Sequence, residues 1–326
     1  AMIQLLCGNI GVPGGGINAL RGHSNVQGIT DIGTLTANTP GYMALPVDSE
    51  PTLVSHLAKR TFKPLQANQT SYWQNYRKFY VSFLKSQFGK NATPENEFGY
   101  QYLPKLDIVY DCIRVFDLMS QGKTNGMIAQ GFNPLMAIPN ANKSREALKK
   151  LKFYVSIDPI ETDSARFWEN HGEFNKSDPA QVKTEVFMLP CSMWCEEEGS
   201  VTNSSRVIQW KWKAADPHYE SKTDVDILAD MFLRIRKLYE KEGGPVADPI
   251  LKLDWRYKDP GDPTAEELAK ELNGYAVSDL ADPSDPTKIV VARGKQVPGF
   301  AVLRDDGSTA CGCWIYPGCF TEAGNQ

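Results

Sequence analysis

The fold is decided by two stretches, Met-Ile-Ala-Gln-Gly-Phe-Asn-Pro at residues 127–134 and Phe-Tyr-Val-Ser-Ile-Asp-Pro at residues 153–159. Each is a short apolar run that ends in turn residues, and residues 144–150 between them are typical of a helix. A strand, a helix and a second strand in this order predict a parallel sheet with a right-handed crossover. Residues 186–190, Val-Phe-Met-Leu-Pro, predict a third strand, and the fold class is therefore α/β.

Turn residues follow the first two predicted strands. Gly131, Phe132 and Asn133 come after the first strand, and the segment from Asp158 to Thr162 comes after the second. In open parallel sheets, ligands bind beyond the carboxyl ends of the strands, so both turns are candidate ligand sites. Asp158 has two interpretations of equal weight, because an acidic residue here either binds a ribose or a base edge or caps a following helix.

The N-terminal part of the chain contains a glycine-rich stretch at residues 8–28, Gly-Asn-Ile-Gly-Val-Pro-Gly-Gly-Gly-Ile-Asn-Ala-Leu-Arg-Gly-His-Ser-Asn-Val-Gln-Gly. It is neither a P-loop nor a dinucleotide fingerprint between a strand and a helix, because it follows the end of a predicted helix. Arg21 offers a planar fork of donors for a carboxylate or phosphate, and His23 can move protons near neutral pH. Spacing alone favours the alternative, in which the arginine makes a surface ion pair and the histidine an ordinary hydrogen bond.

Four further helices are predicted from apolar periodicity and capping signals. The last of them begins with the capping box of Thr264 and Glu267. Much of the C-terminal third is rich in proline, aspartate and turns, and predicts an excursion with short strands. The helices are expected at residues 68–89, 106–120, 223–242 and 264–273, and the excursion at 244–310 with a strand near 289–292.

Composition excludes several classes of protein. With 326 residues, the chain has the length of about two domains. A formal net charge of −4 gives no basic excess for binding nucleic acid, and the apolar runs are too short for a membrane span. Seven cysteines are too few for a disulfide scaffold. Cys191 and Cys195 lack a second pair, and a metal site at Cys311, Cys313 and Cys319 is the minor interpretation.

Several stretches together resemble one known family. Residues 8–31, with the segment Asn-Ala-Leu-Arg-Gly-His-Ser-Asn-Val-Gln-Gly, resemble the active-site segment of molybdenum- or tungsten-dependent formate dehydrogenases, which belong to the DMSO reductase family. Three more stretches are similar to the large catalytic subunits of the respiratory or periplasmic branch. They are residues 67–76, 130–134 and 303–314, and residues 196–209 resemble the acidic-glycine segment of the family.

The resemblance implies a fold, a cofactor and roles for residues. It implies a Rossmann-like parallel-sheet molybdopterin-oxidoreductase domain with parts of neighbouring domains, and a bis(molybdopterin guanine dinucleotide) cofactor on Mo or W. Arg21 would orient the formate carboxylate, and His23 would lie by the same pocket. The turn residues would contact a guanine nucleotide end of the cofactor. These residues are Gly131, Phe132, Asn133, Asp158 and Thr162.

The same resemblance implies partners and a location. In the family, a selenocysteine or cysteine followed by histidine ligates the metal, and a 4Fe-4S cluster accepts the electrons. Both motifs lie upstream of the segment matched here, so the chain is expected to be an internal fragment that is inactive alone and binds no metal itself. The expected partners are formate and CO2, an iron–sulfur electron-transfer subunit and, as an optional further subunit, a membrane cytochrome b. The expected location is the periplasm.

The expected domains are residues 1–22, the end of a preceding α/β domain that carries the active-site loop, and 23–190, a guanine-dinucleotide-binding domain. Residues 191–326 would form an incomplete return segment. Two alternatives stay open: another molybdopterin oxidoreductase, such as a nitrate reductase, and a non-catalytic dinucleotide-binding scaffold. The Leu20-Arg21-Gly22-His23 segment argues against the first.

Overall fold

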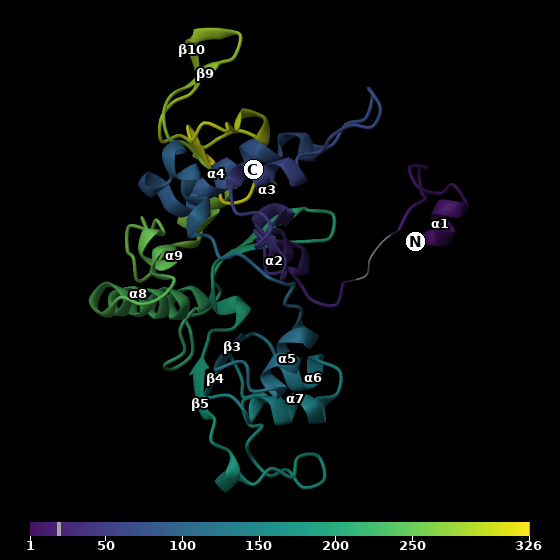
Figure 1. The fold of residues 1–326 in the computed structure, drawn as a ribbon, viewed down its shortest axis with the longest axis vertical. Coiled ribbons are helices and arrows are strands. Elements are labelled where there is room, and N and C mark those ends of the chain that lie inside the picture. Colours follow the sequence, from purple (N-terminus) through teal and green to yellow (C-terminus); the bar gives the residue numbers. More distant parts are fainter. Residues whose placement is uncertain (18–20, 326) are drawn as a thin grey trace.

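The computed structural model describes residues 1–17 and 21–325 and shows an elongated molecule with two main parts (Figure 1). The middle of the chain forms a unit around a small parallel sheet, here called the sheet unit, at the lower end of the view. The early and late segments lie together in a larger part, here called the body, so that the purple, blue and yellow ribbons intermingle. Residues 1–17 lie apart from both, with helix α1 at Met2–Leu6.

The sheet unit contains the three predicted strands. They are β3 (Gly126–Gln130), β4 (Phe153–Asp158) and β5 (Glu185–Pro190), parallel and in the order β3-β4-β5. The register pairs Ile128 with Val155 and Val155 with Phe187. The crossover from β3 to β4 contains α6 (Pro134–Ala137) and α7 (Ala141–Leu148). The predicted α/β class and parallel sheet are therefore confirmed.

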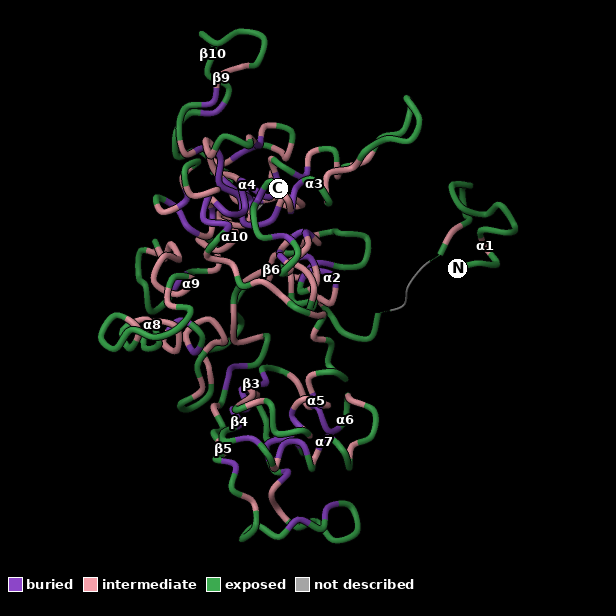
Figure 2. Tube along the Cα trace, in the orientation of Figure 1, coloured by how far each residue is buried: buried purple, intermediate pink, exposed green. Residues whose placement is uncertain are grey.

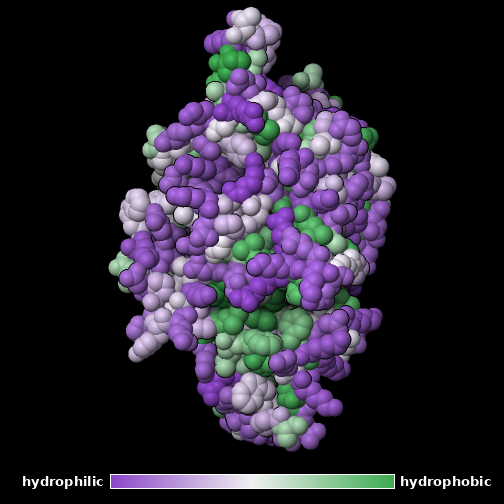
Figure 3. All heavy atoms as spheres, turned by 90° about the vertical axis from the view of Figure 1, so that its left-hand side faces the viewer, coloured by the Kyte–Doolittle hydropathy of each residue, from purple (hydrophilic) through white to green (hydrophobic). Residues whose placement is uncertain are grey.

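The two faces of this sheet are covered differently. Helix α5 (Cys112–Ser120) and α7 cover one face, where Tyr154, Leu148 and Phe116 are buried. On the other face, Val155 and Ile157 pack against Ile227 of α8 (Asp224–Glu242), while Ile128 and Phe187 stay exposed. Figure 3 shows apolar side chains gathered in the lower half of the molecule on the side it presents.

The core of the body is centred on α4 (Tyr76–Phe88), whose aromatic side chains are almost fully buried (Figure 2). Its partners come from distant parts of the sequence. The indole ring of Trp314 stacks on Phe79 with ring centroids 4.4 Å apart, and its Nε1 donates to the carbonyl oxygen of Gly41 at 2.7 Å. The hydroxyls of Ser82 and Thr309 lie 2.8 Å apart. The body is thus closed by contacts between segments more than 200 residues apart.

A buried histidine ties α3 (Leu53–Arg60) to α4. The Nδ1 of His56 lies 2.7 Å from the Oε2 of Glu50, and its Nε2 lies 3.1 Å from the hydroxyl of Tyr76. Burial lowers the pKa of His56 even though Glu50 favours the charged form. The imidazole is therefore neutral near pH 7, and we infer that its proton points to the carboxylate while Nε2 accepts from Tyr76.

The predicted elements agree with the structure in most places. The long helix begins after its cap at Thr223, and Thr264 and Glu267 form the capping box of α10 (Ala265–Asn273). The remaining elements are short. They are α2 Val26–Asp31, α9 Ala247–Lys252, β1 Asn38–Thr39, β2 Met43–Ala44, β6 Gly199–Thr202, β7 Ile208–Lys211, β8 Tyr275–Ala276, β9 Leu280–Asp282, β10 Asp285–Val291, β11 Thr309–Ala310, β12 Phe320–Thr321, β13 Gly324–Asn325, and the 3-10 helices η1 Pro40–Tyr42, η2 Tyr72–Asn75, η3 Gly89–Asn91, η4 Pro94–Tyr102, η5 Pro179–Gln181, η6 Trp194–Glu196 and η7 Phe300–Val302.

Four expectations need correction or refinement. The helix expected at 68–89 begins as α4 only at Tyr76, after the separate 3-10 helix η2 at Tyr72–Asn75. The helix expected at 106–120 begins only at Cys112, because the Asp111 side chain caps it by accepting from the N–H of Arg114. The helix expected at 144–150 runs from Ala141 to Leu148 behind a cap at Asn140. The segment 244–310 is more than an excursion, because Val297 and Leu303 are buried in the core of the body. Within this segment, the β9–β10 hairpin projects outward (Figure 1).

Packing groups the chain differently from the expected division. Residues 43–103 share a core with residues 297–311, whereas residues 116–167 form the core of the sheet unit. The expected domain 23–190 therefore contributes to both cores. The boundaries at residues 22 and 190 stay a prediction.

Candidate active site

The two predicted ligand turns lie side by side at the carboxyl end of the sheet. The backbone N–H of Gly131 donates to the carbonyl oxygen of Ile157 at 2.9 Å. The Oγ of Ser164 donates to the Oδ1 of Asn133 at 2.6 Å, and the Nδ2 of Asn133 donates to Asp163 at 3.1 Å. The structure thus brings together the turn after β3 and the turn after β4. Their predicted role as ligand residues stays a prediction.

Gly131 allows close approach of another molecule to the first turn. Its φ is +57°, in the left-handed region, and a Cβ built on it would find no atom within 4 Å. The ring of Phe132, in contrast, is partly buried against the core of the sheet unit. The backbone of Gly131 is therefore accessible, whereas Phe132 and Asn133 shape the turn.

Asp158 ends β4 in a half-buried position. Its Oδ2 accepts a hydrogen bond from the Oγ of Ser156 at 3.0 Å. Burial raises the pKa of Asp158, the Ser156 bond opposes this, and the nearby Asp224 raises it further. The helix-cap interpretation is wrong, because residues 159–168 form turns and no helix. The carboxylate keeps acceptor capacity for a donor such as a base edge.

Thr162 stands in the same turn. Its Oγ1 accepts from the N–H of Ala165 at 3.4 Å, which leaves its hydroxyl proton available to another group. Three of the five predicted nucleotide residues therefore have groups to offer a ligand: the backbone of Gly131, the carboxylate of Asp158 and the hydroxyl of Thr162. This donor and acceptor set fits a nucleotide with polar edges.

Arg21 and His23 lie in the body, at the entrance to α2. Both side chains are exposed, and they line a cleft of about 430 Å³. The facing wall is the turn of the β6–β7 hairpin at residues 203–205. Within residues 1–17 and 21–325, neither side chain has a hydrogen-bonding or ionic partner, so the expected surface ion pair is not observed. Leu20, quoted with them in the motif, lies outside the described residues.

Helix α2 is held against the hairpin by polar contacts that the sequence analysis missed. The N–H of Thr202 donates to the Oδ1 of Asn25 at 2.9 Å. The fully buried carboxylate of Asp31 accepts from Gln27 at 2.7 Å, from Tyr316 at 3.1 Å and from Arg206 at 3.4 Å. A carboxylate at the end of an otherwise apolar and amide-rich helix was the available signal, but its partners are far away in sequence.

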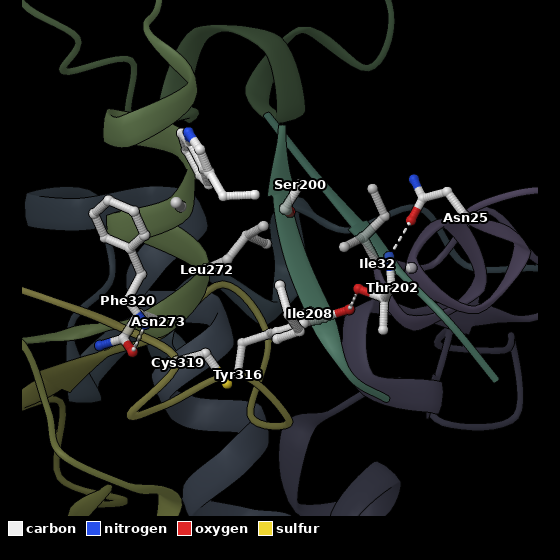
Figure 4. Close-up of a pocket in the computed structure, with 13 residues that line it drawn as sticks. Asn25, Ile32, Ser200, Thr202, Ile208, Leu272, Asn273, Tyr316, Cys319 and Phe320 are labelled. Carbon is white, nitrogen blue, oxygen red and sulfur yellow. Dashed lines mark hydrogen bonds between the residues drawn. The ribbon is translucent and has the colours of Figure 1, made fainter. Parts of the chain in front are cut away.

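A smaller cavity shares lining residues with this cleft (Figure 4). It has a volume of about 120 Å³, and Ile32, Ile208 and Leu272 give it an apolar lining. Asn25 and Thr202 line both the cleft and the cavity, so their hydrogen bond is part of the wall between the two.

Two cysteines of the C-terminal cluster have a structural role in packing. Cys311 and Cys313 are buried, and their thiols donate to the carbonyl oxygens of Leu272 and Asp31. Burial raises the pKa of Cys313 to about 12, so this thiol stays protonated. In the part of the chain that the structure describes, no three His, Cys, Asp or Glu side chains gather as metal ligands.

Comparison with known proteins identifies the relatives of the chain. No family model matches it. Over all 326 residues it is 50% identical to the formate dehydrogenase-O major subunit of Escherichia coli and 49% identical to the formate dehydrogenase major subunit of Haemophilus influenzae. The chain is a homologue of formate dehydrogenase major subunits. It spans about a third of their length, 32% in both cases.

A more distant relative is also a formate dehydrogenase. The formate dehydrogenase 2 subunit alpha (cytochrome c-553) of Nitratidesulfovibrio vulgaris is 42% identical over 98% of the chain, which covers 31% of that relative. Homology to formate dehydrogenases therefore extends over both the cleft of Arg21 and the turns of the sheet unit. Among the described residues, none of the helices has the length and apolar composition that crossing a membrane requires.

Proposed function

We propose that the chain is part of the catalytic subunit of a formate dehydrogenase that oxidises formate to CO2, a proton and two electrons. The observation that carries the proposal is the 50% identity over the whole chain to a formate dehydrogenase major subunit. The open cleft of Arg21 and His23 supports it, because a small anion needs an accessible cation.

The proposed cofactor is bis(molybdopterin guanine dinucleotide) with Mo or W, which supplies a two-electron acceptor when bound. Gly131, Asp158 and Thr162 would hold a guanine nucleotide end. A carboxylate beyond a parallel strand can accept from the N–H groups of a guanine edge, and Gly131 lets the backbone approach. Asn133 would act indirectly, because both ends of its amide are engaged within the turn.

Arg21 would bind the formate carboxylate through two parallel N–H···O bonds and so fix the direction of the C–H bond. His23 would lie beside the same anion, within reach as a hydrogen-bonding side chain. Electrons would leave through a 4Fe-4S cluster to an iron–sulfur subunit, with a membrane cytochrome b as a further partner, and the enzyme would lie in the periplasm. The names of the relatives, major subunit and subunit alpha, support an assembly of several subunits.

The proposal is tested by substituting Arg21→Lys in the full-length subunit that carries this segment. Lysine keeps the charge but loses the fork of donors, so we expect kcat/KM for formate to fall on the order of 100-fold while metal and pterin contents stay normal. Arg293→Lys is the matched control, because Arg293 is exposed beyond β10. Unchanged turnover in Arg21→Lys would exclude a role for this side chain in binding formate.

A further inference from the structure

Asn25 occupies an unusual backbone position two residues beyond His23. As the N-cap of α2 it has φ 60° and ψ 14°, in the left-handed region that asparagine and glycine tolerate best. Its side chain does not cap its own helix. Instead it points from α2 toward the hairpin, as the dashed line to Thr202 in Figure 4 shows.

The hydrogen-bond partner of Asn25 is a buried backbone N–H, which requires an acceptor. Thr202, at the end of β6, is only 3% exposed, and its N–H donates to the Oδ1 of Asn25 at 2.9 Å. A buried N–H without an acceptor costs about 1–3 kcal/mol. The bond therefore joins α2 to the hairpin across 177 residues of sequence.

The first turn of α2 is adapted to this contact. A Cβ at Gly28 would lie 2.1 Å from the Oδ1 of Asn25 and 3.2 Å from the Oγ1 of Thr202. Any side chain at position 28 would thus push the Asn25 amide away from Thr202. Gly28 has no positive φ, so the need for glycine here comes from the contact and not from the backbone.

We propose that Asn25 is a positioning residue for the substrate cleft, which it sets by locking the Arg21–His23 segment opposite the hairpin turn at residues 203–205. The inference rests on the proposed function of that cleft. Arg21 and His23 have no partners of their own among the described residues, so their place depends on the backbone that follows them. Asn25 is the nearest residue downstream with a side-chain bond to the opposite wall. A displacement of about 1 Å at a positioned group can cost 100-fold in rate.

The first test compares Asn25→Gly with Asn25→Asp in the full-length enzyme. Glycine keeps the left-handed backbone but loses the acceptor, whereas aspartate keeps both. We expect kcat/KM for formate to fall on the order of 10-fold in Asn25→Gly and to stay within about 2-fold of wild type in Asn25→Asp. Cofactor content should be normal in both.

The second test measures amide hydrogen exchange at Thr202 in the full-length subunit, a measurement that does not depend on formate turnover. Exchange should be faster in Asn25→Gly and in Gly28→Ala, and like wild type in Asn25→Asp, with melting temperatures showing that each variant is folded. The inference is overturned if Thr202 exchanges at the wild-type rate in Asn25→Gly. It is also overturned if kcat/KM is unaffected by Asn25→Gly but reduced by Arg21→Lys. If Arg21→Lys has no effect while Thr202 exchange responds, the proposed function of the cleft has failed and the contact itself stands.

Discussion

The turns at the end of the sheet and the cleft of Arg21 are built in opposite ways. The turns belong to one continuous unit, in which Asn133 and Ser164 meet within about 30 residues of sequence. The walls of the cleft come from segments 177 residues apart that are joined by Asn25 and Thr202, while Asp31 joins α2 to Tyr316 across 285 residues. The turns are thus made by local topology and the cleft by long-range polar contacts.

This difference indicates how substitutions should affect the turns and the cleft. In the turns, the backbone of Gly131 and the side chains of Asp158 and Thr162 belong to one local unit, and a side-chain change there has mostly local effects. Around the cleft, buried polar groups hold distant segments in place, and removal of one partner leaves the others buried and unsatisfied. The predictions below therefore contrast changes in the two regions.

The largest effect is expected for Asp31→Ala. This change removes the buried acceptor that the amide of Gln27, the hydroxyl of Tyr316 and the guanidinium of Arg206 share, and leaves Gln27 only its bond to Tyr42 and Tyr316 only its contact with Thr202. The free energy of unfolding should therefore fall by about 3 kcal/mol. Denaturant unfolding of the chain measures the loss. Asp48→Ala, at an exposed position, is the control and should be neutral.

Asp31→Ala also tests whether the walls of the cleft and the sheet unit are stabilised independently. Hydrogen exchange should increase in α2 and the β6–β7 hairpin, while β3 and β4 keep their wild-type protection. An equal increase of hydrogen exchange in the sheet unit would show that the two regions unfold together and would contradict the contrast.

A middle-sized effect is expected for Gly131→Ala. The left-handed backbone costs alanine about 1 kcal/mol, and there is no steric clash because the space around the added Cβ is empty. Gly122→Ala is a matched control with φ +70° and equally open surroundings, and should lose the same stability. If the turn binds the nucleotide, only Gly131→Ala should also lower the cofactor content of the full-length subunit.

The smallest change in stability is expected for Asp158→Asn. Because burial raises the pKa of Asp158, its ionised form slightly destabilises the fold at neutral pH. The amide should therefore raise the free energy of unfolding by about 0.3 kcal/mol, since the carboxylate is partly screened by water. Cofactor content of the full-length subunit should nevertheless fall, and a normal content would argue against nucleotide binding at Asp158.

The stabilising effect of Asp158→Asn should depend on pH. An acid with a raised pKa in the folded state carries no penalty below its unfolded value of about 3.9, and the penalty develops as the pH rises through the folded value. Thermal melts of the two proteins should therefore converge at acidic pH and separate toward pH 7. A difference that persists below pH 3.9 would show that the effect is not due to ionisation.

Most of the sheet unit could be predicted from the sequence, because its signals are local. Apolar runs marked β3, β4 and β5, and the turn residues Gly131 and Asp158 stand directly after them. The start of α5 was misplaced because Ile108 and Val109 continue the apolar pattern before the cap at Asp111. Arg21 and His23 were found through resemblance and not through spacing.

The long-range contacts could not be predicted in this way. Nothing near Asn25 indicates that its amide meets Thr202, and nothing near Asp31 indicates Arg206 or Tyr316. The same holds for Trp314, whose stacking on Phe79 places a proline- and turn-rich segment in the core of the body. Periodicity reports which face of an element is buried, but not which distant segment covers it.

The bond between Ser82 and Thr309 has a consequence for synthesis of the protein in the cell. The two residues are 227 positions apart, so at 5–20 residues per second the ribosome needs roughly 10–45 s to deliver the second after the first. During this time the aromatic side chains of α4 lack the C-terminal residues that bury them, whereas the sheet unit can already complete its own core. The nascent chain should therefore need chaperone protection over α4 more than over the sheet.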